Sequence, residues 1–227
     1  MKKFTVISGD LVGYTGLSAA GRARIEQEIK VFLATWTDEF IFFSRLIKGD
    51  YLEIVCSEPG AALRLAIMLK CKIKSTELQK DDISDNQRTK YFQEYGIRLA
   101  IGYGPLAGLD IENGRIDGEA IFMSGRQINS QKTFDKERIV IKNTLFFQSE
   151  DPEINQNWKV ILDLLDFMLA NATARQCQII LHKLGGKSEQ EISSLLEISQ
   201  PAVNRHSTRA GWNAIETAVL YFESQIT

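Results

Sequence analysis

Cysteine and histidine are scarce in this chain of 227 residues. The three cysteines, Cys56, Cys71 and Cys177, form no CxxC pair, and their odd number argues against a disulfide framework and a structural zinc site. We expect each of them to be a small buried apolar side chain. The two histidines, His182 and His206, have no partner at metal-ligand spacing, which argues against a zinc site or a catalytic histidine.

Long apolar runs are absent as well. Stretches such as Glu39–Leu46 and Val160–Leu169 are short or interrupted by charge, whereas a membrane-spanning helix needs about 20 apolar residues. The first ten residues contain two lysines but lack the longer apolar stretch and small-residue cleavage site of a signal peptide. We therefore expect no membrane segment and a cytoplasmic location.

The chain has no excess of charge of either sign. It carries 27 Lys and Arg residues against 29 Asp and Glu residues, so it lacks the overall positive charge common among nucleic-acid-binding proteins. With 44% hydrophobic and 25% charged residues it has the composition of a globular protein with an apolar core. Its length suits one large domain or two modest ones.

The first 150 residues alternate strand and helix patterns. Strands are predicted over Phe4–Ser8, on both sides of a turn at Lys48–Asp50, over Gly96–Gly104 and over Ile139–Ile141; helices over Ala19–Phe40, Ala61–Leu69 and Glu119–Gln131; and a loop over Gln79–Lys90. These patterns predict an α+β domain over residues 1–150, with a mostly antiparallel sheet and flanking helices, of the ferredoxin-like or palm kind.

Only helical patterns remain after the polar stretch around residues 149–157, where Pro152 can start a helix. We predict a second, all-α domain over residues 155–227. Within it, Ser188 and Glu191 have the spacing of a capping box. A turn over Glu197–Ser199 and a second helix over Gln200–Arg209 follow, with Val203 facing inward.

Residues Thr173–Ala218 resemble the helix-turn-helix of bacterial regulators and the sigma-factor region that reads promoter DNA, in which Ser-Gln-x-x-Val follows a tight turn. The resemblance implies that the second helix enters the major groove of DNA. Its early polar residues, Gln200, Asn204 and Arg205, would then meet base edges.

Charge in this region supports DNA contact only locally. From residue 151 to the end there are six Lys and Arg residues against nine Asp and Glu residues, but the second helix carries Arg205 and Arg209 and no acid. Two positions depart from the pattern: Glu197 stands where glycine is common, and Ser193 where alanine is common. The alternative is a helical hairpin that packs on a partner protein.

Asp10 and Asp50 form a second constellation. Asp10 ends the first strand and precedes a loop, Gly13-Tyr14-Thr15, that can offer backbone amides to phosphate. If the strands are neighbours, Asp50 stands beside Asp10, and two such carboxylates suit a pair of Mg²⁺ ions that bind a nucleoside triphosphate. The alternative is that both are turn residues, where aspartate is common.

The segments Asp10–Thr15, Gly49-Asp50 and Gly118–Arg126 occur in the order found in class III nucleotidyl cyclase domains, and the chain also resembles the SatD family. The resemblance covers about Phe4–Ile141. It implies that Asp10 and Asp50 bind the metal ions, that Arg126 stabilises the transition state, and that the protein is a homodimer, because cyclase sites form between subunits.

Three positions depart from the cyclase pattern. Phe122 stands where asparagine is expected, and Leu46 stands where the base-selecting lysine is expected. The position expected for the acidic partner of that lysine is closest to Arg115. Loss of one such polar group raises a reaction barrier by roughly 2.7–4 kcal/mol. Arg126 and Lys48 could still hold phosphates, so the pattern favours nucleotide binding over turnover.

The leading hypothesis is therefore a DNA-binding transcriptional regulator that carries a degenerate cyclase-like domain, which senses a nucleotide or forms a dimer. The alternative hypothesis is an Mg²⁺-dependent nucleotidyl cyclase or a related enzyme acting on nucleoside triphosphates. A third reading makes the helical tail a protein-interaction module.

Overall fold

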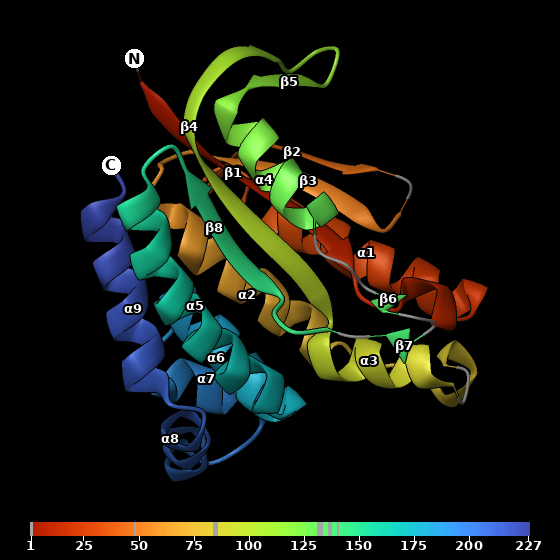
Figure 1. Cartoon of the computed structure of the whole chain (residues 1–227). Coiled ribbons are helices and arrows are strands. Elements are labelled where there is room, and N and C mark those ends of the chain that lie inside the picture. Colours follow the sequence, from red (N-terminus) through yellow and green to blue (C-terminus); the bar gives the residue numbers. More distant parts are fainter. Residues whose placement is uncertain (1, 48, 84–85, 131–133, 136–137, 140) are drawn as a thin grey trace.

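The computed structural model describes residues 2–47, 49–83, 86–130, 134–135, 138–139 and 141–227. Figure 1 shows a twisted sheet with helices on both of its faces and a group of further helices beside it. The main sheet has the order β2-β3-β1-β4-β5, and β8 also pairs with β4. Its strands are β1 (Lys3–Leu11), β2 (Ile41–Ile47), β3 (Tyr51–Cys56), β4 (Ile97–Asp110), β5 (Arg115–Gly118) and β8 (Leu145–Ser149).

The long strand β4 joins two parts of this sheet. Its first half lies between β1, with Asp10 opposite Arg98, and β8. Its second half pairs with β5. These pairs are antiparallel except β4–β8, which is parallel. A separate short hairpin is formed by β6 (Phe134–Asp135) and β7 (Arg138–Ile139).

The two faces of the sheet are covered by different helices. Side chains alternate along a strand, so Ile7 of β1 packs in the core with α1 (Ala19–Trp36) and α2 (Ala61–Ser75), whereas its neighbour Val6 packs with Ala120 of α4 (Glu119–Ser130). In the sequence, the short helix η1 (Tyr14–Gly16) connects β1 to α1, and the short helix η2 (Lys80–Asp82) and α3 (Gln87–Tyr95) lie between α2 and β4. α3 lies at the end of the sheet where β4 begins (Figure 1).

The C-terminal helices continue the core on the side of α2. They are α5 (Pro152–Asn171), α6 (Ala174–Leu184), α7 (Glu189–Leu196), α8 (Gln200–Arg209) and α9 (Trp212–Gln225). Phe147 of β8, Trp158 of α5 and Phe222 of α9 form a ring cluster, with 4.7 Å between the ring centroids of Trp158 and Phe222. The apolar core is thus continuous from the sheet into the helical region.

Polar contacts reinforce this attachment. Arg64 of α2 donates to the Glu223 carboxylate at 2.7 Å and to the Leu184 carbonyl at 2.8 Å. The Tyr103 hydroxyl donates to the Thr227 carbonyl at 2.8 Å, which holds the C-terminus beside β4. Both termini accordingly lie at the same end of the molecule (Figure 1).

The α+β prediction is confirmed at this coarse level, as are the turn between β2 and β3 and the three predicted N-terminal helices, to within a few residues. The prediction of a loop over residues 79–90 was wrong in part, because α3 begins at Gln87. Its N-cap is Asn86, whose side chain accepts from the Thr89 amide at 3.0 Å. Few apolar residues mark this helix, so the cap alone signals it.

The last strand of the main sheet was also predicted wrongly. It is β8 at Leu145–Ser149, not Ile139–Ile141; of the predicted residues, Ile139 belongs to β7 and residue 140 lies outside the described residues. All three cysteines are buried and unpaired in disulfides, as predicted. Among the helices in the described part of the chain, none combines the length and the apolar character that a membrane crossing requires.

Candidate functional site

The α7–α8 segment is built by local signals that the sequence carries. The Ser188 hydroxyl accepts from the Glu191 amide at 3.3 Å, and the Glu191 carboxylate accepts from the Ser188 amide at 2.8 Å, which completes a capping box. The hydrogen bond from the Ser188 hydroxyl, with that from its amide, lowers the pKa of Glu191. α7 therefore begins where the sequence predicts.

The turn between α7 and α8 depends on one residue in the left-handed region. Glu197 has φ 53° and ψ 41°, and among the described residues it alone has a positive φ without being glycine. The Ser193 hydroxyl secures the turn by donating to the Ile198 carbonyl at 2.6 Å. Ser193 is thus part of the turn, which accounts for a polar residue at a position where alanine is common.

A small apolar cluster holds α6, α7 and α8 together. Ile179 of α6, Ile192 of α7 and Val203 of α8 are fully buried, and Leu196 and Ile198 pack against them. This cluster is separate from the main core. Val203 faces inward as predicted, and its burial fixes which face of α8 points outward.

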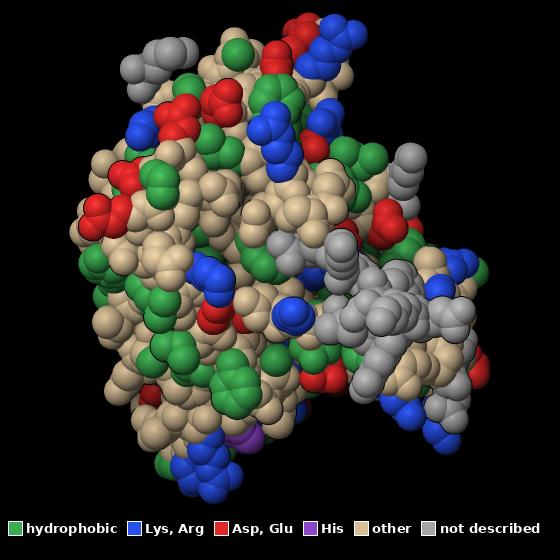
Figure 2. All heavy atoms as spheres, in the orientation of Figure 1, with side chains coloured by type: hydrophobic (Ala, Val, Ile, Leu, Met, Phe, Trp, Pro, Cys, Tyr) green, Lys and Arg blue, Asp and Glu red, His purple; other side chains and the backbone are tan. Residues whose placement is uncertain are grey.

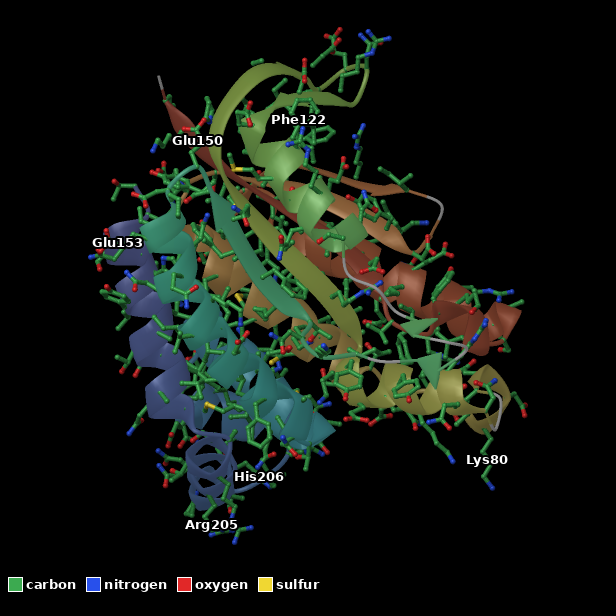
Figure 3. All side chains as sticks on the ribbon, viewed as in Figure 1. Lys80, Phe122, Glu150, Glu153, Arg205 and His206 are labelled. Atoms are coloured by element: carbon green, nitrogen blue, oxygen red, sulfur yellow. The ribbon has the colours of Figure 1, made fainter. Side chains whose placement is uncertain are left out.

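The outward face of α8 carries the predicted DNA contacts. Gln200, Asn204, Arg205 and Arg209 are all exposed, whereas Val203 and Ser207 are buried. Within the described part of the chain neither arginine has an ion-pair partner. Arg205 points away from the rest of the molecule (Figure 3), and basic side chains gather at that lower end in Figure 2.

A second candidate site lies where β1 ends, beside the turn between β2 and β3. The Leu11 amide donates to the Asp50 carbonyl at 2.9 Å, and Asp10 pairs with Tyr51 across the two strands. Asp10 at the end of β1 and Asp50 in the turn before β3 therefore lie side by side, because β1 and β3 are neighbouring strands. Register, rather than sequence proximity, brings them together.

Arg98 of β4 forms an ion pair with the carboxylate of Asp10. Its Nε donates to Oδ1 of Asp10 at 2.9 Å, and its Nη2 donates to Oδ2. The two side chains are only 12% and 23% exposed, so this bidentate pair is a partly buried element of the sheet. The cross-strand position of Arg98 opposite Asp10 makes the pairing direct.

This arrangement bears on the predicted Mg²⁺ site. A two-metal site needs carboxylate oxygens directed at the ions, but both oxygens of Asp10 face the Arg98 guanidinium. Across the described residues, no group of three or more His, Cys, Asp and Glu side chains is placed to hold a metal ion. In this arrangement both carboxylate oxygens of Asp10 are engaged by Arg98, and the two-metal site stays a prediction.

A cavity of about 310 Å³ opens at this end of the sheet. It is lined by Leu11, Val12, Gly13, Tyr14, Thr15, Asp50, Arg88, Tyr91, Arg98 and Ile141. The three predicted nucleotide-binding residues of the loop after β1 and one of the predicted metal ligands thus border one cavity. Lys48, the fourth predicted nucleotide-binding residue, lies outside the described residues.

The loop after β1 is pressed against the start of α3. Gly13 has φ +66°, and a Cβ there would lie 2.3 Å from the Arg88 carbonyl oxygen; a Cβ at Gly16 would lie 2.8 Å from Cβ of Arg88. Only glycine permits this approach. The Thr15 hydroxyl accepts from the Arg88 guanidinium at 2.7 Å, which places that arginine at the mouth of the cavity.

Tyr14 connects this loop to α1 and to the turn between β2 and β3. Its hydroxyl donates to the Glu26 carboxylate, and burial together with this hydrogen bond raises the pKa of Tyr14. Gly49 has φ +82°, and a Cβ there would lie 2.5 Å from the Glu26 carboxylate. The turn that presents Asp50 is thereby fixed by glycine at its tip.

Arg126 lies elsewhere. It is exposed on α4, with its guanidinium 5.9 Å from the centroid of the Phe122 ring, and it does not line the cavity. Phe122 is itself 47% exposed on the same helix and is labelled near the top of Figure 3. Within this single chain, Arg126 is therefore not joined to Asp10 and Asp50.

Three polar residues of the cavity lining were missed from the sequence: Arg88, Tyr91 and Arg98. Arg88 and Tyr91 belong to α3, whose first four residues lay in the predicted loop. Arg98 stood within a predicted strand, and its ion pair with Asp10 follows only from the strand register. The N-cap residue Asn86 could have revealed the start of α3. The sequence carries no local signal for the register between β1 and β4.

No family model, curated protein or solved structure matches this sequence significantly.

Proposed function

We propose that the protein is a DNA-binding transcriptional regulator, in which α7 and α8 are a helix-turn-helix and α8 reads DNA. The main support for this proposal is the exposed polar face of α8. Its exposed residues are Gln200, Asn204, Arg205 and Arg209, whereas Val203 is buried on the opposite face. Exposed arginines bind phosphate or guanine, and Gln and Asn can pair with adenine. The packing of α6, α7 and α8 around one small cluster supports the same assignment.

In this proposal the first 150 residues are a ferredoxin-like domain that senses a nucleotide. The order β2-β3-β1-β4 with α1 and α2 on one face supports the ferredoxin-like assignment, and the cavity beside Asp50 supports a ligand-sensing role. The regulator acts as a homodimer, because two copies of α8 on neighbouring half-sites compensate for the modest charge of one copy.

A titration of labelled genomic DNA fragments at several salt concentrations tests this proposal. We expect binding that weakens with salt, because Lys and Arg contacts to phosphate release counterions. Arg205→Ala should reduce the slope of log K against log salt by about 1 for each of the two copies of α8 in the dimer if the arginine contacts phosphate. Lys30→Ala removes an exposed positive charge from α1 and should leave the titration unchanged.

Two further variants separate base reading from phosphate contact. Arg205→Lys keeps the charge but loses the bidentate geometry, and Asn204→Ala removes an amide that can pair with adenine. If α8 reads bases, these variants should lose discrimination between fragments more than overall affinity. Absence of salt-dependent binding by the unmodified protein, or equal binding by Arg205→Ala, would refute the proposal.

A further inference from the structure

We propose that the cavity between the loop after β1 and α3 binds a nucleoside monophosphate without a divalent cation. This inference rests on the sensing part of the proposed function and names its ligand. The carboxylate of Asp10, which a metal-dependent site would use, is held by Arg98 through two hydrogen bonds. A guanidinium supplies positive charge at the position where the metal-dependent hypothesis places Mg²⁺.

The charges around the cavity limit the ligand. Arg88, Arg98 and Asp50 line the cavity, and Asp10 lies behind its wall in an ion pair with Arg98. Arg98 is already matched by Asp10. A triphosphate would bring several more negative charges close to Asp50, whereas the smaller charge of one phosphate is offset in part by Arg88, the other arginine among the described lining residues.

Arg88 is placed to receive that phosphate. It is exposed near the beginning of α3, and the only hydrogen bond we find for its side chain within the described residues is to the neutral Thr15 hydroxyl at 2.7 Å. No ion pair involves it in that part of the chain. The planar guanidinium can therefore form two parallel hydrogen bonds with a phosphate.

The rest of the wall suits a nucleoside. Tyr14 and Tyr91 offer aromatic surface, and Leu11, Val12 and Ile141 add apolar surface for the face of a base. The ionised Asp50 carboxylate can only accept hydrogen bonds, so it suits a ribose hydroxyl or an N–H group of the base as the donor. A volume of about 310 Å³ is at the lower end for ligand sites, which favours one nucleotide over a dinucleotide.

Calorimetric titration of the full chain with each nucleoside 5′-monophosphate tests the proposal. Each titration is run with Mg²⁺ and with EDTA, and the comparison ligands are the nucleoside, inorganic phosphate and the nucleoside triphosphate. We expect at least one monophosphate to bind equally well in both buffers and more tightly than the other three ligands. Arg88→Gln should weaken this binding about tenfold or more, because a charge-assisted pair is lost.

Lys90→Gln is the matched control, because it removes an exposed charge from the same helix without touching the cavity. It should bind like the unmodified chain. Binding that requires Mg²⁺, tighter binding of the triphosphate, no binding of any monophosphate, or equal binding by Arg88→Gln would each overturn the inference. The DNA titration with Arg205→Ala is independent, so failure of ligand binding and failure of DNA binding are told apart.

Discussion

Lys70 is fully buried on α2 and is tied to four partners. Its Nζ donates to the carbonyls of Tyr95 at 3.0 Å and Ile97 at 3.1 Å and to the Thr144 hydroxyl, and it lies 3.4 Å from the Asp166 carboxylate. Burial lowers the pKa of Lys70, which the negative charge of Asp166 partly offsets. The ammonium thereby joins α2, α5 and the beginning of β4 in one polar network.

Lys70→Met should lower the free energy of unfolding by about 3–5 kcal/mol, because it leaves the Asp166 charge buried without its partner. The double variant Lys70→Met/Asp166→Leu removes both charges and should recover part of that loss, although it also removes the hydrogen bonds that Asp166 accepts from the Thr144 amide and hydroxyl. Lys72→Met, on the same helix, breaks the more exposed pair with Glu28 and should cost less than about 1 kcal/mol. Urea unfolding at pH 7 measures all three, and a Lys70→Met loss no larger than that of Lys72→Met would contradict this account.

At the scale of elements, Glu197 sits in a conformation that favours glycine. With φ 53° its Cβ is crowded by the backbone. Glu197→Gly should relieve this strain and stabilise the protein by about 0.5–1 kcal/mol, net of the greater entropy of glycine in the unfolded chain. Glu197→Ala removes the charge but keeps the strain, so it should give no such gain. Thermal unfolding followed by circular dichroism distinguishes them, and a gain from alanine equal to that from glycine would point to charge rather than strain.

Elements that carry their own boundary signals were predicted well. α7 begins at the predicted capping box formed by Ser188 with Glu191, a motif that is readable within four residues. α3 and β8 were missed for different reasons. α3 is mostly polar and buries only a few side chains, such as Phe92, so it has little apolar periodicity. β8 forms by pairing with β4, which is remote in the sequence.

The candidate site divides in the same way. The loop after β1 and the Gly49-Asp50 turn were predicted from local patterns, and they do border the cavity. The pairing of Asp10 with Arg98 was not predicted, because it depends on the register between β1 and β4, residues 88 positions apart in the sequence. A carboxylate that a motif marks as a metal ligand can thus be engaged by a cation that no motif includes.

At the scale of the whole molecule, the helical region and the sheet share one apolar core through α2. α6 and α9 pack on α2, and Lys74 of α2 donates to the Leu169 and Ala170 carbonyls, both at 2.7 Å. Burial on both sides leaves α2 almost without solvent contact from Ala61 to Ile73. We therefore expect the two predicted domains to unfold as one cooperative unit.

Tryptophans on both sides of the predicted boundary provide the measurement. Trp36 belongs to α1 and its ring lies against Gly185 of the helical region, whereas Trp212 belongs to α9. Variants that keep only one of them, with phenylalanine at the other positions including Trp158, therefore place one reporter where the two regions meet and one within the helical region. Urea unfolding should give the same midpoint and the same slope for both reporters and for circular dichroism, because exposing α2 on one side removes packing from the other. Circular dichroism of each variant controls for destabilisation by the substitutions themselves. Two separated transitions would mean that the shared core around α2 does not couple the regions, and the helical region would then fold as an independent domain.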